Sequence, residues 1–297
     1  MLLYFKNLLY YTVIMKTNLT IVVADTAYYN LTKRAIEQTQ KITGAEKVLL
    51  FSDQNFYPGC DYIEISPIDQ VEYNKLILKD IAPHITTDHF MVIQYDGMPI
   101  NSEHWTDEYL QYDYIGAPWP WGSENRRVGN GGFSIRSRRL AELCLDESVV
   151  FNPPGYGDNN YMEDTHICHL YRSFFDQHGM KFAPVNLAKK FSAEIPGGRF
   201  PTYGFHGTLC LPYYLDDDHM EFYIDNLSER QWMSPVQTRI FFGLYLAEKY
   251  DLCEHMMERG IEVRPDLKQV LINQLPQENN YFPNLTVADI EDLLINY

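Results

Sequence analysis

The chain has 297 residues, a formal net charge of -16, and 45% hydrophobic and 14% aromatic residues. This length allows one large hydrophobic core, or one core and a smaller module, and the aromatic content excludes an intrinsically disordered chain. The strong negative charge argues against nucleic-acid binding, which depends on clustered lysine and arginine side chains. A phosphorylated ligand would therefore need local basic groups or a metal ion.

The five cysteines indicate neither a disulfide framework nor a zinc site, because their number is odd and no two have Cys-x-x-Cys spacing. We therefore expect a reducing, cytoplasmic location. The first 15 residues are apolar and aromatic, but they are shorter than the ~20 residues of a membrane helix and lack a small-residue cleavage site. We interpret residues 1–16 as an N-terminal extension, with a peripheral membrane anchor as the alternative.

Short apolar runs alternate with helical patterns in the first third of the chain. Strands are predicted at 18–25, 47–53, 62–65 and 88–96, and helices at 32–42 and 73–81. This order is typical of an α/β fold with a mostly parallel sheet covered by helices. No glycine-rich dinucleotide or phosphate-loop motif follows the first strand, which argues against an ordinary nicotinamide enzyme or phosphate-loop NTPase.

Polar side chains end three of these strands. They are Asp25, Thr26, Asp53, Gln94, Tyr95 and Asp96. Ligands of open α/β sheets bind beyond the carboxyl ends of the strands, so these residues are candidates for ligand binding. Gln94 and Asp96 are two apart and are expected on the same face of one strand. Taken alone, Asp96 is also consistent with a turn or a helix cap.

A second group is the glycine-rich segment 129–134, Gly-Asn-Gly-Gly-Phe-Ser. Gly131 and Gly132 would let the backbone approach a ligand closely, while a simple turn between strands is the alternative. A basic helix start is expected just after it, at Arg136 and Arg138-Arg139.

Aromatic residues are dense immediately upstream, at 112–121. Trp119 and Trp121 suit the faces of sugars as well as they suit a core. Arg126 and Arg127, in the loop between, are the nearest basic candidates for a diphosphate, with an exposed surface pair as the alternative.

A third group is the acidic pair Glu163-Asp164, which follows the glycine-rich loop 153–158. Both acids suit the first turn of a helix, where the helix dipole favours carboxylates. The functional interpretation makes one of them a general base, and Asp164 is preferred. His166 and His169 lack the His-Glu-x-x-His spacing of a zinc site.

The last candidate residue is His206, which lies between glycines. It is either an ordinary histidine or a ligand, late in the domain, that completes a site with Asp96.

From residue 213 the character of the sequence changes. An acidic break at 216–218 precedes helices predicted near 236–250, 265–275 and 287–295, with Ser234-Pro235 as a start signal. We therefore divide the chain into 17–212 and a helical region, 213–297, that could complete the core, cover the site or form a dimer.

Together these groups resemble a glycosyltransferase of the GT-A type, a Rossmann-like fold, over roughly 18–212. In that family a strand-end Asp-x-Asp binds a divalent cation, a Gly-Gly segment lines the donor sugar, a Glu-Asp pair supplies the base and a later histidine joins the metal. The corresponding residues here, in the same order, are Gln94, Asp96, Gly131, Gly132, Glu163, Asp164 and His206.

Longer strings strengthen the resemblance. Gly-Gly-Phe-Ser, followed by a glycine-rich loop and Glu-Asp, is similar to the inverting beta-1,4-galactosyltransferases. The strings Gln-Tyr-Asp-Gly, Tyr-Asp-Tyr-Ile-Gly-Ala-Pro-Trp, Gly-Asn-Gly-Gly-Phe-Ser and Glu-Asp-Thr look like a little-characterised family of proposed glycosyltransferases.

The resemblance implies an inverting sugar transfer from a UDP- or GDP-sugar to a glycan or another hydroxyl acceptor, with Asp164 as base. Asp96 and His206 would hold the metal, Mn²⁺ or Mg²⁺, and the histidine favours Mn²⁺. The first acid of Asp-x-Asp is replaced by Gln94, which offers only a neutral amide. The implied donor site takes in Asp25, Thr26, Asp53, Gln94, Tyr95, Asp96, Gly131, Gly132, Arg126 and Arg127, and the acceptor site Trp119, Trp121 and Tyr156.

Two other classes of protein remain open. A non-catalytic module that binds a glycan or a nucleotide sugar would bind donor without turnover. A metal-dependent nucleotidyltransferase or hydrolase would consume a nucleoside triphosphate, and pyrophosphate as product would identify the transferase.

Overall fold

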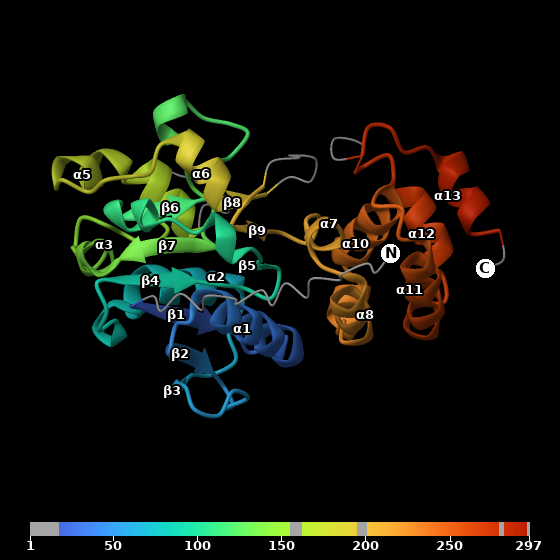
Figure 1. The fold of residues 1–297 in the computed structure, drawn as a ribbon, viewed down its shortest axis with the longest axis horizontal. Coiled ribbons are helices and arrows are strands. Elements are labelled where there is room, and N and C mark those ends of the chain that lie inside the picture. The colour runs from blue at the N-terminus through green and yellow to red at the C-terminus, as the bar shows by residue number, and fades with distance from the viewer. Residues whose placement is uncertain (1–17, 155–161, 195–200, 279–281, 296–297) are drawn as a thin grey trace, which may run out of the picture.

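The computed structural model describes residues 18–154, 162–194, 201–278 and 282–295. The central sheet has the strand order β3-β2-β1-β4-β7-β6 (Figure 1). Its strands are β1 Leu19–Ala24, β2 Lys47–Ser52, β3 Asp61–Glu64, β4 His89–Val92, β6 Tyr114–Gly116 and β7 Ser134–Ser137. Neighbouring strands are parallel except at β7, which runs antiparallel to both β4 and β6. The predicted α/β fold with a mostly parallel sheet is confirmed.

Both faces of the sheet are buried, which explains why its strands read as continuous apolar runs. In β1, Ile21 and Val23 contribute to the larger cluster of buried side chains, while Val22 contributes to the smaller one on the opposite face. Helix α1 (Tyr29–Thr43) packs on the first face and ends at Gly44, whose φ of 64° is the left-handed cap expected there. Helix α2 (Gln70–Lys75) continues as a π-helical turn, Leu76–Asp80, over the second face.

The fourth strand is shorter than predicted. It ends at Val92, and the next residues form a tight turn in which Gln94 and Gly97 exchange two backbone hydrogen bonds of 3.1 and 3.0 Å. Gln94 and Asp96 therefore flank a turn and do not share one face of a strand, so that expectation was wrong. The turn opens a small second sheet of β5 Gly97–Pro99, β9 Gly204–His206 and β8 Ser192–Ala193.

Short helices connect these strands on the sheet side. They are α3 Arg138–Leu143, α4 Glu163–Thr165 with a π-helical turn His166–Leu170, α5 Arg172–Gln177 and α6 Val185–Phe191. Turns of 3-10 helix lie at Ala82–His84, Ser102–His104, Asp107–Gln111 and Glu124–Arg126. The basic helix start expected at Arg136 and Arg138-Arg139 is confirmed at Arg138, where α3 begins after its cap Ser137, and was wrong for Arg136, which belongs to β7.

The C-terminal region is helical, as predicted. Its helices are α7 Leu211–Tyr214, α8 Asp217–Asp225, α9 Glu229–Trp232, α10 Pro235–Leu246, α11 Tyr250–Val263, α12 Leu267–Gln274 and α13 Val287–Leu293. The predicted start at Ser234-Pro235 is confirmed, since the Ser234 side chain accepts the Val236 N–H at 3.2 Å. The sequence patterns predicted α10, α12 and α13 and missed α7, α8, α9 and α11.

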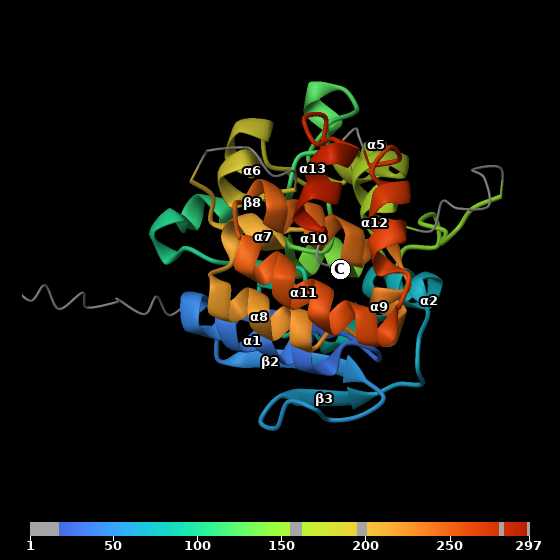
Figure 2. The same ribbon diagram turned by 90° about the vertical axis from the view of Figure 1, so that its right-hand side faces the viewer.

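The helical region stands at one side of the sheet and shares its core (Figures 1 and 2). Helix α8 lies against α1, where the Asn30 amide donates to Asn226 at 2.9 Å and Arg34 lies 2.9 Å from a ring nitrogen of His219. One cluster of buried apolar side chains runs from the sheet into the helices. The helical region therefore completes the hydrophobic core, which is one of the roles expected for it. The domain boundary at residue 212 stays a prediction.

Among the helices of the described ranges, we find none with the length and apolar character that a bilayer crossing needs. The N-terminal extension, 1–16, lies outside the described residues. The cytoplasmic location and the peripheral anchor stay predictions.

Candidate active site

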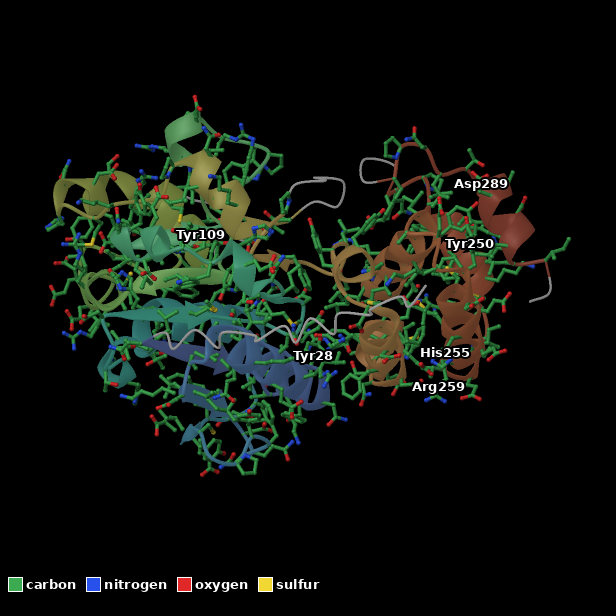
Figure 3. The ribbon with its side chains drawn as sticks, viewed as in Figure 1. Tyr28, Tyr109, Tyr250, His255, Arg259 and Asp289 are labelled. Carbon is green, nitrogen blue, oxygen red and sulfur yellow. The ribbon has the colours of Figure 1, made fainter. Side chains whose placement is uncertain are left out.

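A cavity of about 650 Å³ opens beyond the carboxyl ends of β1 and β4. It is bordered by the β1–α1 loop, the Gln94–Gly97 turn, the glycine-rich segment, the start of α4, strand β9 and the helical region. Tyr28, labelled in Figure 3, lines it where the sheet meets the helices. The predicted site residues that line it are Asp25, Thr26, Gln94, Tyr95, Asp96, Trp119, Trp121, Gly132, Glu163, Asp164 and His206.

At the end of β1 the side chains of Asp25 and Thr26 face this cavity. Asp25 Oδ1 accepts the backbone N–H groups of Ala27 and Tyr28 at 2.8 and 2.9 Å, which fixes the loop before α1. Asp25 Oδ2 is buried and has no hydrogen-bond partner within the described part of the chain. Burial raises the pKa of this carboxyl group, and its hydrogen bonds oppose the rise.

Gln94 and His206 are joined directly at the centre of the cavity. The Gln94 Oε1 atom lies 3.1 Å from His206 Nε2, and the Gln94 amide nitrogen donates to the Tyr73 hydroxyl at 2.8 Å. The Asn130 amide nitrogen lies 2.8 Å from His206 Nδ1 and also donates to Glu194 at 2.8 Å.

Asp96 is held beside this network by backbone contacts. Its carbonyl oxygen accepts the Gly207 N–H at 2.7 Å, and Gly97 is paired in register with His206 between β5 and β9. Burial raises the pKa of the Asp96 carboxyl group, while the nearby His206 opposes that rise. The pairing of β5 with β9 therefore brings together the two residues predicted to bind a metal, since Asp96 immediately precedes β5 and His206 ends β9.

Gly131 and Gly132 are required by close packing. A Cβ atom on Gly132 would lie 2.2 Å from His206 Nε2 and 2.5 Å from Gln94 Oε1. A Cβ atom on Gly131 would lie 1.8 Å from the nearer carboxylate oxygen of Glu163. Any larger residue at either position would displace a side chain of the site, so the segment is more than a simple turn.

The two acids Glu163 and Asp164 have different environments. Glu163 forms a 2.6 Å ion pair with Arg136, and both side chains are almost completely buried. Asp164 accepts the backbone N–H groups of Gly131 at 2.9 Å and of Thr165 at 2.6 Å. Burial, and secondarily the charge of Glu163, raise the pKa of Asp164 to about 7. A carboxylate with a pKa near neutrality suits a general base, whereas Glu163 is engaged in holding the structure.

Three predicted donor residues lie away from the cavity. The hydroxyl group of Tyr29 donates to both oxygens of Asp53, at 2.9 and 3.1 Å. Arg126 donates to the Ser173 hydroxyl at 2.8 Å, and Arg127 donates to the carbonyl oxygen of Trp119 at 3.0 Å. None of the three lines the cavity. The two arginines that the sequence offered for a diphosphate are thus engaged elsewhere.

The tryptophans form one edge of the cavity. The rings of Trp119 and Trp121 stack with centroids 4.4 Å apart and an angle of 12° between their planes. Trp119 is buried, while 47% of Trp121 is exposed. Trp121 therefore offers exposed aromatic surface at the cavity that Asp164 also lines. The third predicted acceptor residue, Tyr156, lies outside the described residues.

The histidines after Asp164, His166 and His169, do not line the cavity, so they are not candidate ligands of a metal ion bound there. Both ring nitrogens of His166 are in hydrogen-bond contact, with the Met162 carbonyl oxygen at 2.7 Å and the Asn152 N–H at 3.1 Å. His169 packs on the edge of the Trp121 ring.

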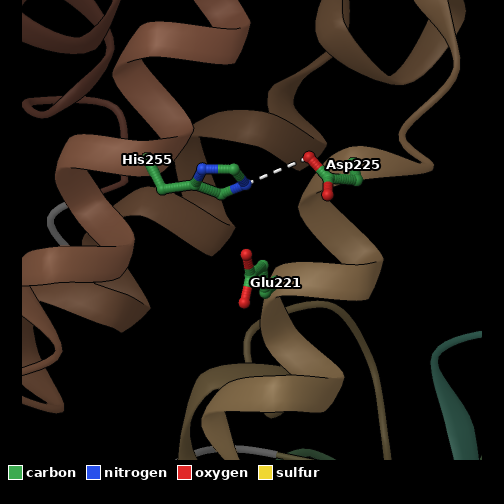
Figure 4. Close-up of side chains that lie close together, drawn as sticks. All are labelled: Glu221, Asp225 and His255. Carbon is green, nitrogen blue, oxygen red and sulfur yellow. Dashed lines mark hydrogen bonds and ion pairs between the residues drawn. The ribbon is translucent and has the colours of Figure 1, made fainter.

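A different group of possible metal ligands lies between α8 and α11 and comprises Glu221, Asp225 and His255 (Figure 4). His255 Nε2 lies 3.0 Å from Asp225 Oδ1, and Arg259 lies 3.2 Å from the same oxygen. This carboxylate already has a cationic partner, and none of these residues lines the cavity. The group therefore reads as an exposed ion-pair network between two helices.

Several residues that line the cavity belong to no sequence motif, so they could not be predicted from the sequence. They are Tyr28, Tyr73, Asn74, Glu194 and Arg230. Asn130 belongs to the glycine-rich segment 129–134, but nothing in the sequence singled it out. Its φ is 39°, a positive value that asparagine adopts more readily than most residues other than glycine. In this conformation its amide group contacts His206.

Similarity to known proteins is limited. Residues 64–201 match a family described as "Protein of unknown function (DUF5672)". No curated protein matches the chain. One similar solved structure is a glycosyltransferase involved in the glycosylation of the major capsid of PBCV-1, with 15% identity, coverage of 64% of this chain and 92% of that chain, and a TM-score of 0.42.

A second similar structure is the mannosyltransferase PcManGT from Pyrobaculum calidifontis in complex with GDP-Man and Mn²⁺. Its identity is 8%, it covers 94% of this chain and 86% of its own, and the TM-score is 0.39.

Proposed function

We propose that the protein is a glycosyltransferase that moves a sugar from a UDP- or GDP-sugar to an acceptor hydroxyl with inversion at the anomeric carbon. The observation that carries the proposal is the meeting of distant segments in one cavity. Asp164 brings a carboxylate whose pKa is raised to about 7. Gln94, Asp96 and His206 bring metal-type ligands to the same cavity, and Gly132 brings a bare backbone.

The ligand set fits a divalent cation. Gln94 Oε1 and His206 Nε2 are 3.1 Å apart, a spacing that neighbouring ligands of an octahedral cation have when each bond is about 2.1 Å. Asp96 would add the charged oxygen, and the nitrogen ligand favours Mn²⁺ over Mg²⁺. When bound, such a cation neutralises the negative charge that grows on the departing diphosphate.

Asp164 performs the proton transfer in this proposal. It takes the proton of the acceptor hydroxyl while that oxygen forms a bond to the anomeric carbon and the bond to the diphosphate breaks. One displacement from the side opposite the leaving group inverts the configuration. The N–H groups of Gly131 and Thr165 orient the carboxylate, and the Arg136–Glu163 pair holds the start of α4. The exposed face of Trp121 suits the apolar face of an acceptor sugar.

The direct test is the release of nucleoside diphosphate from a panel of UDP- and GDP-sugars in the presence of Mn²⁺. We expect release by the wild type, a large loss with EDTA, and a large loss in Asp96→Asn. Asp88→Asn is the matched control, because Asp88 is an exposed acid just before the other end of β4. Full activity of Asp96→Asn would contradict the proposal, and a product with retained anomeric configuration would contradict inversion.

The replacement of an acid by Gln94 favours one other function, a module that binds a nucleotide sugar without using it. Saturable binding of a UDP- or GDP-sugar with no release of diphosphate across many acceptors would identify that function.

A further inference from the structure

The cavity has an unequal balance of charge. Its acidic lining residues are Asp25, Asp69, Asp96, Glu163, Asp164 and Glu194. Among the described residues that line it, Arg230 is the one arginine or lysine, with His206 as the other basic side chain. A nucleoside diphosphate is strongly anionic, so a cavity of this composition needs every positive charge that it has.

Arg230 is contributed by the helical region and is available to a ligand. It is exposed, and within the described ranges it has no hydrogen bond or ion pair. The backbone below it is well held: Ser228 and Gln231 form a capping box at the start of α9, and Gln231 and Trp232 are buried. The guanidinium group is thus exposed on a backbone that capping and burial hold in place.

The helical region is fastened to the turn that carries Asp96. The Tyr223 hydroxyl donates a hydrogen bond to the carbonyl oxygen of Tyr95. The rings of Tyr28 and Tyr95 pack with centroids 4.9 Å apart. Burial raises the pKa of Tyr28, and the charge of Arg230 acts against that rise, in keeping with a guanidinium group near this ring. Arg230 therefore lies at the junction of the β1–α1 loop and the Asp96 turn.

We propose that Arg230 binds the diphosphate of the nucleotide-sugar donor, so that the helical region is a working part of the donor site. This inference rests on the function proposed above. A guanidinium group matches phosphate oxygens with paired N–H donors. Because Gln94 replaces a charged ligand, a cation held there would be bound less tightly. A second, permanent positive charge from Arg230 compensates for that weakness.

The test compares ligands with and without the diphosphate on the full-length protein. Binding of UDP, GDP, uridine and guanosine is measured by calorimetry, with Mn²⁺ and again with EDTA. We expect Arg230→Gln to weaken binding of the nucleoside diphosphate about tenfold or more and to leave binding of the nucleoside unchanged. Arg230→Lys should retain part of the affinity. The matched control is Arg259→Gln, an exposed arginine of α11 that does not line the cavity.

Three outcomes distinguish a failure of the role of Arg230 from a failure of the proposed function. Unchanged binding of the diphosphate in Arg230→Gln would overturn this inference while leaving the proposed function intact. An equal loss for nucleoside and diphosphate would also overturn it, because Arg230 would then support the fold of the site instead of contacting the phosphates. A wild type that binds neither UDP nor GDP and turns over neither class of sugar would remove the proposed function itself.

Discussion

Two ion pairs, one on the sheet side and one on the helical side of the molecule, differ in their exposure to solvent. On the sheet side, Arg136 and Glu163 form an ion pair whose side chains are only 2% and 4% exposed. On the helical side, Arg259 and Asp225 form a pair that is 47% and 41% exposed. Burial holds the first pair in one arrangement, while solvent screens the charges of the second. The cavity combines both situations, because the buried acids Glu163 and Asp164 and the exposed Arg230 all line it.

Replacing Asp164 by Asn should give the largest effect on activity. The amide keeps the shape of the carboxylate but cannot accept a proton, so kcat should fall about a thousandfold. In the wild type, kcat should rise with pH through about 7, because the base must be ionised and burial raises its pKa to that value. Initial rates across a pH series measure both effects. Asp69→Asn, at an exposed acid of the same cavity, is the control.

Asp164 should also make stability depend on pH. The pKa of Asp164 is about 7 in the folded protein, above its ordinary value of 3.8. Between these two pH values the folded chain therefore keeps a proton that the unfolded chain has released. This contribution to folding is fully present below pH 3.8 and is lost as the pH rises through about 7. Denaturant titrations at about pH 5 and about pH 8 should show a larger drop for the wild type than for Asp164→Asn. Equal drops would contradict the buried, protonated carboxyl group.

The contrast between the two ion pairs can be tested by the same substitution in each. Arg136→Met should lower the free energy of unfolding by about 3–5 kcal/mol, because it leaves the Glu163 carboxylate buried without a partner. Arg259→Met should lower it by less than about 1 kcal/mol. Urea titrations at one pH measure both. The double variant Arg136→Met, Glu163→Leu should recover much of the loss, and a failure to recover would assign Arg136 a role beyond its pair.

Gln94→Glu should sharpen the metal site. The added charge stands where the amide oxygen now lies, 3.1 Å from His206 Nε2, and should tighten binding of Mn²⁺ by about tenfold. Calorimetric titration with Mn²⁺ in the absence of nucleotide measures the change. Gln94→Met is the control without a ligand oxygen. Weaker Mn²⁺ binding in Gln94→Glu would show that the amide is needed as a hydrogen-bond donor to Tyr73 and not as a ligand.

The smallest effect is expected from Tyr223→Phe, which loosens the junction between the two sides. It removes the hydrogen bond to the Tyr95 carbonyl oxygen, at a loss of about 1 kcal/mol in stability. The KM for the donor should rise severalfold while kcat changes little, because the turn and Arg230 would lose their common support. Tyr250→Phe, at an exposed tyrosine of α11, is the control. A fall in kcat alone would contradict this.

Near-continuous apolar runs made the strands β1 to β4 predictable from the sequence, and polar residues at their ends pointed to the cavity. Strands β6 and β7 were not predicted. The end of β4 was misplaced, because Ile93 extends the apolar run past the point where pairing stops. Asp96 and Gly97 are the local signs of the turn.

The wrong or missing predictions for individual residues have one common cause. Asp53 and Asp25 look alike in sequence, and only the position of Tyr29 in space takes Asp53 out of the cavity. Arg136 looked like a helix start because its partner Glu163 lies 27 positions away. Arg230 has no motif at all. Partners brought together by tertiary packing leave no periodic trace in the chain.

The pairing of β5 with β9 has a consequence for folding. Gln94 and His206 are 112 positions apart, and they meet only when these two strands are in register. Closing so long a loop is entropically unfavourable until the intervening chain has folded, so contacts of this kind form late. The parallel strands β1, β2 and β4 can assemble earlier from nearer segments. During refolding, recovery of Mn²⁺ binding should therefore lag behind recovery of secondary structure.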